Sequence, residues 1–320
     1  MSYFLFKRFL MLLATLAAAS VIVFGALEVL PGNAAQALMG PDADPAAVQA
    51  KARALGLDVP PARRYAGWIG GLLHGDMGLS YAYGAPVSQL VAERLAVTVP
   101  LALLAMALTV LLALPAGVLA AARHNRLGDV GLMTLAQVGM AIPNFWLAIL
   151  LILLFSVKLQ WFSAGGFDGW YFGDGLWRGL WAGVRALLLP AVALAVVQGA
   201  ILARFVRASV LEVLREDFVR TARAKGLSRR GVLWGHVLRN AMIPVITVMG
   251  LQFAELLAGA IVVENVFYLP GLGRLVFQSI ANRDLVVVRN CVLLLAGMVV
   301  VVNFVVDVLY ALIDPRVKAR

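Results

Sequence analysis

The chain has 320 residues, of which 62% are hydrophobic and only 14% charged, and its formal net charge is +10. Soluble domains carry about 25% charged residues, so this composition excludes an ordinary soluble protein and indicates that lipid covers much of the surface. The single cysteine excludes an internal disulfide or a thiolate metal cluster. The three histidines lie far apart and outside any HExxH pattern, which argues against a metal site.

Six apolar blocks are each close to the ~20 residues that cross a bilayer, and we expect them to be membrane-spanning helices. They are Phe9–Leu30, Val97–Ala122, Leu132–Val157, Ala186–Val206, Ala241–Val263 and Asn290–Ile313. The first block exceeds the ~7–15 apolar residues of a signal-peptide core, which favours a retained anchor. The sequence therefore predicts an all-α integral membrane protein, with residues 1–320 forming one transmembrane domain.

Proline recurs in these blocks. Pro115, Pro143 and Pro244 are expected inside helices, and Pro100 and Pro190 near helix starts. An interior proline removes a backbone hydrogen bond and favours a kink. Kinked helices can splay around a cavity, although they are common in membrane proteins of every kind.

Residues 31–96 follow the first block and are too polar to cross a membrane. Pro45–Leu55 is expected to form a short helix. Two apolar stripes at helical spacing follow, with a turn at Gly75, Asp76 and Gly78 between them. The stripes are Tyr65, Trp68, Ile69 and Leu72, then Val87, Leu90, Val91 and Leu95. These residues favour interfacial helices on the outer leaflet and leave open a docking platform for an external partner.

The basic residues are distributed unevenly between the short connecting segments. With the N-terminus inside, the inner segments carry sixteen Lys and Arg residues and the short outer loops carry six. The positive-inside rule then places both termini and residues 207–240 in the cytoplasm, and residues 31–96 outside. This rule accounts for the net charge, so no nucleic-acid partner is expected.

The most informative segment is Glu216–Gly226. Two acids open it and basic residues fill its last turn, which suits the two ends of a helix dipole. Gly226 stands where a left-handed cap would end a helix, and Ser228 offers a new N-cap. The pattern predicts a short helix, a tight turn and a second helix leading into the fifth span. Small residues on this helix would let it lie in a groove of another protein; the alternative is a solvated basic loop that only sets topology. The small residues are Thr221, Ala222 and Ala224.

Polar side chains inside the apolar blocks are candidates for a translocation path. They are Glu255, Gln252, Gln198 and Asn144. Glu255 is expected either to face a central cavity or to pair with another helix. Glu28, Glu264 and Asp307 lie near span ends, within expected reach of headgroup water. No GxxxxGK[S/T] or GxSxG sequence occurs, so we expect no ATP site and no enzymatic activity in this chain.

The segment Arg220-Thr221-Ala222-Arg223-Ala224-Lys225-Gly226 resembles the EAA loop of bacterial ABC importer permeases. The parent pattern is Glu-Ala-Ala-x-x-x-Gly. The departure here, Arg220-Thr221-Ala222, is itself similar to the dipeptide/oligopeptide branch. The resemblance continues, in the branch's order, through segments over nearly the whole chain. These are Leu30-Pro31-Gly32 (with Asn33 where an acid is common), Gly75–Ser80, Ile142–Trp146, Val263–Gly273 and Tyr310–Arg316.

The resemblance implies a permease subunit with the fold of a type I ABC importer transmembrane domain. It would belong to an ATP-driven importer of di- or oligopeptides, or related small solutes, in the bacterial cytoplasmic membrane. The long segment after the first span is similar to that of the first of the two permeases in such systems. Implied partners are a second homologous permease, two cytoplasmic ATPase subunits that hold ATP and Mg²⁺, an extracytoplasmic solute-binding protein, and membrane lipid. The implied coupling residues are Glu216, Asp217, Arg220, Thr221, Ala222, Arg223, Ala224, Lys225 and Gly226.

Other functional classes remain open at this stage. The main alternative is a secondary transporter driven by an ion gradient, with Glu255 and Asp307 as ion sites. An intramembrane enzyme acting on lipid, or a scaffold, are further alternatives. The sequence does not indicate the solute, because similar permeases carry dipeptides, oligopeptides, glutathione, nickel chelates or sugars.

Overall fold

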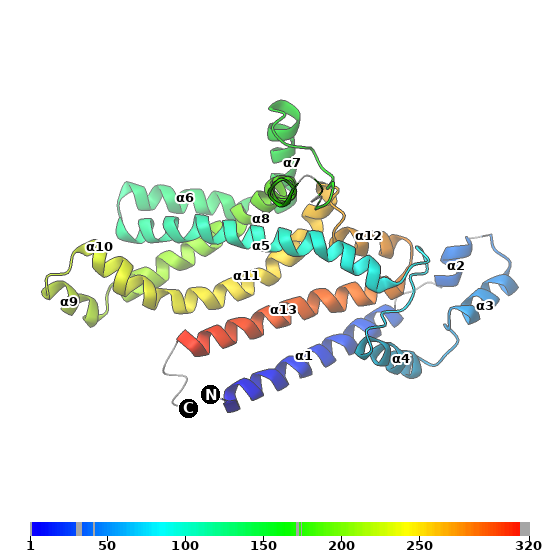
Figure 1. Ribbon diagram of the computed structural model, residues 1–320. Helices are drawn as coiled ribbons and strands as arrows, with labels where there is room; N and C mark the ends of the chain where they lie inside the picture. Colours follow the sequence, from blue (N-terminus) through cyan, green and yellow to red (C-terminus); the bar gives the residue numbers. More distant parts are fainter. Residues whose placement is uncertain (1, 30–33, 41, 171–172, 174, 314–320) are drawn as a thin grey trace. The chain divides into compact units, whose positions relative to one another are not determined.

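The computed structural model describes residues 2–29, 34–40, 42–170, 173 and 175–313 (Figure 1). The segments Leu30–Gly32 and Asp314–Arg316, parts of two of the motifs above, lie outside these residues. The described part is almost entirely helical, and its one extended pairing is an isolated bridge between Leu79 and Pro86. The all-α prediction is confirmed.

The helices of the first half are α1 (Ser2–Val29), α2 (Ala34–Met39), α3 (Pro45–Ala54), α4 (Pro61–Leu73), α5 (Val87–Ala122), α6 (Leu127–Ala141) and α7 (Asn144–Leu151). A π-helical turn, η1 (Ile152–Lys158), follows α7. The second half contains α8 (Leu176–Val213), α9 (Asp217–Ala224), α10 (Arg229–Val232), η2 (Leu233–Val237), α11 (Leu238–Val266), α12 (Leu272–Ala281) and α13 (Leu285–Ile313).

Five helical stretches in the described residues are long and apolar enough to cross a membrane, and a bent pair makes a sixth candidate. They overlap the six predicted blocks. However, α5 and α8 begin at Val87 and Leu176, well before the predicted Val97 and Ala186, because the helical backbone continues beyond the strictly apolar stretch. The expectation that Pro100 and Pro190 lie near helix starts is therefore wrong; both lie inside helices.

The third predicted span is not one straight helix. Helices α6 and α7 meet at a bend of 98°. Pro143 has no N–H to continue the ladder and disfavours the helical conformation of the residue before it. Ile142 is accordingly extended, with φ −85° and ψ 122°. The prediction of a continuous Leu132–Val157 helix is wrong for this reason.

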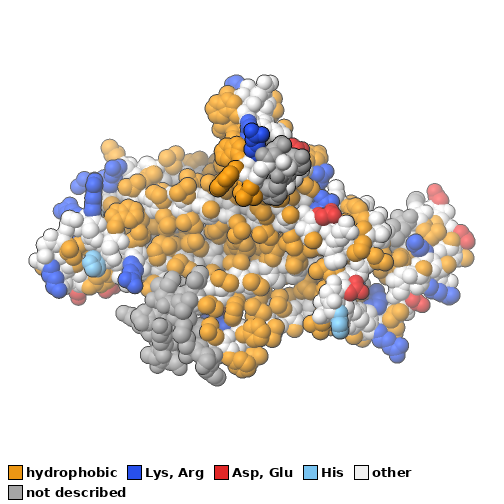
Figure 2. Space-filling model, viewed as in Figure 1, with side chains coloured by type: hydrophobic (Ala, Val, Ile, Leu, Met, Phe, Trp, Pro, Cys, Tyr) orange, Lys and Arg blue, Asp and Glu red, His pale blue; other side chains and the backbone are white. Residues whose placement is uncertain are grey.

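The chain divides into two compact units. The first contains residues 1–8, 99–269 and 302–320. Helix α8 is its most buried span. A carbon placed at Gly117 of α5 would lie 2.6 Å from the carbonyl oxygen of Ala203 in α8, so only glycine permits this close approach. Figure 2 shows hydrophobic side chains along the long helices, with Lys and Arg gathered where α9, α10 and the α5–α6 turn lie.

The second unit contains residues 9–98 and 270–301. Two aromatic residues of the α4 stripe pack on protein here, and the expected position of this helix on the outer leaflet stays a prediction. Tyr65 and Trp68 pack on Phe24 of α1, with ring centroids 5.4 and 6.1 Å away. Trp68 Nε1 also donates to Asn290 Oδ1 of α13 at 2.9 Å. This hydrogen bond fixes the amphipathic helix against its own chain.

The second stripe forms the first turns of α5. Val87 and Val91 are buried against Leu272, Leu275 and Val287. The predicted turn before it is confirmed, since Gly75 and Gly78 both have φ +80°. The N–H of Gly78 donates to Asp76 Oδ1 at 2.8 Å.

Candidate functional site

Helix α9 forms from the acidic–basic pattern of the Glu216–Gly226 segment. Glu216 takes the extended N-cap conformation, with φ −66° and ψ 147°, and Asp217 opens the first turn. The carboxylate of Asp217 lies near the positive end of the helix dipole, and Arg223 lies near the negative end. The exposed Arg220–Asp217 ion pair, at 3.5 Å, adds little stability.

The end of α9 is a Schellman motif. Gly226 has φ +85°, its N–H donates to Arg223 O at 3.0 Å, and Leu227 N–H donates to Ala222 O at 3.3 Å. Ser228 then caps α10, accepting from Gly231 N–H at 3.1 Å. The predicted helix, glycine turn and second helix are confirmed, and Arg229–Val266 continues as one apolar helical stretch.

Helix α9 has an anchored side and an exposed side. Val219 and Ala222 are buried in a cluster with Val210, Val232 and Val237. The exposed side carries the other expected coupling residues and one aromatic ring. These residues are Glu216, Asp217, Phe218, Arg220, Thr221, Arg223, Ala224, Lys225 and Gly226. The structure thus separates the three small residues, because Ala222 packs inward while Thr221 and Ala224 face outward.

The two long helices that flank α9 are tied to each other. Ser209 Oγ, near the end of α8, donates to the carbonyl oxygen of Ala241, near the start of α11, at 2.8 Å, and both residues are buried. The spans before and after α9 are therefore joined to each other close to it. No sequence pattern predicts this hydrogen bond, because a serine bonded to a backbone carbonyl has no characteristic spacing.

Three of the four expected path residues meet between α8 and α11. Gln198 Nε2 donates to Glu255 Oε2 at 3.2 Å, and Gln252 Nε2 donates to Gln198 O at 3.0 Å. The side-chain oxygens of Gln198 and Gln252 are buried and have no hydrogen-bond partner among the described residues. The amide pair therefore positions the Glu255 carboxylate and retains acceptor capacity behind it.

Glu255 is exposed, whereas Gln198 and Gln252 are buried. It accepts a hydrogen bond from another helix, which is one of the two expected alternatives, and it is open on the surface of α11. That it faces a central cavity stays a prediction. Asn144 begins α7 immediately after the Pro143 bend, and its Nδ2 would lie 2.9 Å from a carbon placed at Gly259, one helical turn after Glu255. The fourth candidate, from α7, thus lies beside α11 close to the other three.

The remaining carboxylates near span ends behave differently from one another. Asp307 pairs with Arg8 at 3.0 Å, and Glu28 pairs with Arg64. Glu264 is fully buried, so the expectation that it reaches headgroup water is wrong. The sequence analysis also missed Asp129, which is buried and forms a bidentate pair with Arg207. An Asp next to a basic turn gives no sequence signal of burial.

Comparison with known proteins gives the family. Residues 113–319 match the family described as "Binding-protein-dependent transport system inner membrane component", and residues 1–102 match its N-terminal counterpart. The chain belongs to this family. It is a permease subunit and a multi-pass membrane protein of the bacterial ABC importer class.

Relatives cover the whole permease. It is 41% identical over 318 residues to a putative peptide transport system permease protein of Brucella abortus (strain 2308), covering 99% of each chain. It is 42% identical over 317 residues to the glutathione transport system permease protein GsiC of Escherichia coli (strain K12), again covering 99% of each. These relatives are named as permease components, a role without catalysis, so the alternatives of a secondary transporter and a lipid enzyme are not retained.

A solved structure shows the same fold. An inward-facing form of the MetNI methionine ABC transporter matches with a TM-score of 0.58, covering 71% of the permease and 97% of that chain. The sequence identity is 17%. The predicted type I importer fold is thereby confirmed.

Proposed function

We propose that this permease imports di- or oligopeptides, or related small solutes, and that α9 couples it to a cytoplasmic ATPase. The main observation in support of this proposal is that α9 packs on its own chain on one side and is exposed on the other. The buried Val219 and Ala222 fix its position, while Phe218, Thr221 and Ala224 are open to a partner. A loop that only sets topology needs neither the buried anchor nor the Schellman cap.

Coupling follows from the way α9 is joined to the spans. An ATPase that binds the exposed side of α9 displaces this helix. The buried side of α9 transmits the displacement to α8 and α11. These helices carry Gln198 and Glu255, so the displacement reaches the polar face of the transmembrane region. ATP binding then favours one of two conformations because the ATPases bind the two with different affinities.

The proposed path runs along the face of α11 that exposes Glu255. A carboxylate deep in a span is costly in lipid, so such a face is covered by protein or water. A second homologous permease supplies the opposite wall. Gln198, Gln252 and Asn144 lie behind or beside Glu255 and offer amide groups to a peptide backbone.

The proposed topology places both termini and residues 207–240 in the cytoplasm, and residues 31–96 outside. Residues 1–320 act as one permease domain together with a second permease, two ATPases and an extracytoplasmic binding protein. The named transport systems of the relatives support peptides or glutathione as the cargo class.

Site-directed cross-linking tests this arrangement, because the chain's single cysteine, Cys291, is buried. Ala224→Cys on α9 and Ala66→Cys on α4 are both at exposed alanines and serve as a matched pair. In the assembled transporter, Ala224→Cys should cross-link to the ATPase and Ala66→Cys should not. A membrane-impermeant maleimide should label Ala66→Cys in intact cells and Ala224→Cys only in inverted vesicles.

The outcomes separate the parts of the proposal. Failure of Ala224→Cys to cross-link, with the ATPase copurified, would overturn the role of α9. Labelling of Ala224→Cys from outside would overturn the topology. Uptake that proceeds in proteoliposomes without any ATPase would overturn ATP-driven import.

A further inference from the structure

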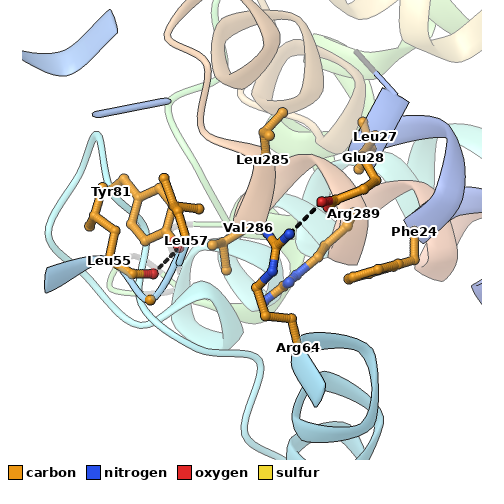
Figure 3. A pocket seen from close by; sticks show the side chains of 11 residues that line it. Phe24, Leu27, Glu28, Leu55, Leu57, Arg64, Tyr81, Leu285, Val286 and Arg289 are labelled. Atoms are coloured by element: carbon orange, nitrogen blue, oxygen red, sulfur yellow. Dashed lines mark hydrogen bonds and ion pairs between the residues drawn. The ribbon is translucent and has the colours of Figure 1, made fainter. Parts of the chain in front are cut away.

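A cavity of about 160 Å³ lies in the second unit, where α1 ends and α13 begins. Its polar lining consists of two arginines, a glutamate and a tyrosine, and apolar side chains such as Leu57 and Val286 form its other walls. Figure 3 shows these side chains converging from α1, α4, α13 and the connecting loops. The polar residues are Arg64, Arg289, Glu28 and Tyr81.

The two arginines differ in their partners. Arg64 is paired with a carboxylate, because its Nη2 pairs with Glu28, and its Nε donates to Val59 O at 3.0 Å. Arg289 lies over the ring of Trp68, with Cζ 5.2 Å from the centroid. Among the described residues, the buried Nε of Arg289 has no hydrogen-bond acceptor. One guanidinium of the pocket is therefore uncommitted to any carboxylate.

Asp284 also acts electrostatically on Arg289 but is directed elsewhere. Its carboxylate accepts from Ser80 Oγ at 2.5 Å, from Ala82 N–H at 3.0 Å and from Val287 N–H at 3.3 Å. It is fully buried by these contacts, so it does not reach into the pocket as a hydrogen-bond partner. The local carboxylates thus leave Arg289 available.

A guanidinium is always charged and is costly to withdraw from water unless an acceptor meets it. Tyr81 provides a second donor beside it. Its hydroxyl donates to Leu55 O over a long 3.4 Å, and burial raises the pKa of Tyr81, which keeps the phenol protonated. The uncommitted guanidinium, and a phenol whose single O–H is held only by this long hydrogen bond, therefore face one partly enclosed space.

We propose that this pocket binds the carboxylate of a small amphiphilic molecule, with Arg289 and Tyr81 as the donors. One available guanidinium suits a monoanion, whereas a phosphate dianion favours several cations. The apolar walls suit a hydrophobic group next to the carboxylate. A cavity of about 150 Å³ is enough to hold a benzene-sized molecule.

The inference deepens the proposed function, since peptides end in a carboxylate and the proposed topology puts this pocket at the extracytoplasmic end of the permease. Neither the match to the family nor the coupling role of α9 depends on it. Direct binding is therefore measured separately from transport.

The test is isothermal titration calorimetry on the full chain in phosphatidylcholine nanodiscs. N-acetyl-leucine and N-acetyl-leucinamide differ only in the carboxylate, and only the first should bind. Arg289→Gln should weaken its affinity about tenfold or more, as expected for loss of a charge-assisted hydrogen bond. Arg178→Gln removes the same charge from an exposed position in the first turn of α8 and should leave the affinity unchanged.

A second variant guards against misfolding of the first. Leu57→Trp fills the pocket while keeping Arg289, and it should also abolish binding. Binding of the amide as strongly as the acid, or an unchanged affinity in Arg289→Gln, would overturn the proposal. A third outcome would also overturn it: no binding of the carboxylate in neutral nanodiscs, together with binding of phosphatidylglycerol at the pocket. That outcome would assign the pocket to a lipid phosphate. If the titration shows no binding while ATP-driven uptake is normal, the proposed carboxylate site is wrong and the assignment as a transporter still holds.

Discussion

Arg207 of α8 donates two hydrogen bonds to Asp129 of α6, from Nε to Oδ1 at 2.6 Å and from Nη2 to Oδ2 at 2.7 Å. The Asp129 side chain is 3% exposed and that of Arg207 23%. Asn125 N–H also donates to Asp129 Oδ2, at 3.0 Å. The pair joins the two helices next to the α5–α6 turn, on the side that the proposed topology places in the cytoplasm.

Asp129→Asn should destabilise the folded chain. Removing one partner of a buried ion pair leaves an uncompensated charge and costs about 3–5 kcal/mol. Since Arg207 is partly exposed, we expect a loss of about 3 kcal/mol in the free energy of unfolding. Denaturant titration in nanodiscs measures this loss. Arg204→Met is the control, because Arg204 is exposed on α8 near Arg207, and it should change stability little. Equal stability of Asp129→Asn and wild type would refute the structural role of the pair.

Gly226→Pro should abolish coupled uptake while the chain still inserts. Proline removes the N–H that donates to Arg223 O and cannot adopt φ +85°, so the Schellman cap is lost. Gly226→Ala is a milder change, with an expected cost of about 1–2 kcal/mol for a left-handed L-residue.

The measurement is ATP-dependent uptake in reconstituted vesicles, normalised to inserted protein. Gly235→Ala is the matched control, because Gly235 lies in the same segment with open space around it and without a positive φ. Normal uptake by Gly226→Pro would show that the cap geometry is not needed for coupling.

Glu255→Gln should lower uptake without lowering stability. The amide keeps the shape of the side chain but removes a charge that is costly to hold within a span. Uptake should fall about tenfold if the carboxylate binds a charged group of the cargo, as for loss of one charge-assisted hydrogen bond. Thermal unfolding should be unchanged or shifted upward. Glu212→Gln, at an exposed position near the end of α8, should affect neither quantity; a loss of stability in Glu255→Gln with full uptake would make Glu255 structural.

Gly117→Ala should destabilise the packing of α5 on α8. The added methyl would lie 2.6 Å from Ala203 O and from Val206 Cβ, and overpacking of this kind costs about 1–3 kcal/mol. Gly131→Ala in α6 meets nothing within 4 Å and should be neutral or stabilising by about 0.5–1 kcal/mol, because alanine is the better helix former. Parallel unfolding curves of the two variants distinguish these outcomes; equal stabilities would contradict the close approach of the helices.

The sequence by itself determined what depends on local pattern. Long apolar blocks located the spans because a bilayer demands continuous apolar helix. The acids, bases and glycine of Glu216–Gly226 fixed α9 and its cap, because dipole and φ preferences act within a few residues. The same pattern carried the family resemblance.

Tertiary structure decided everything that depends on which faces meet. Only packing shows that Ala222 of α9 turns inward and Thr221 outward, and that Trp68 of α4 contacts α1 and α13. The pairing of Asp129 with Arg207, and of Gln198 with Glu255, joins residues far apart in sequence, where spacing carries no information. Likewise, Pro143 predicted a kink within one span, but the 98° bend between two helices is seen only in the structure, where α6 and α7 each pack against α8.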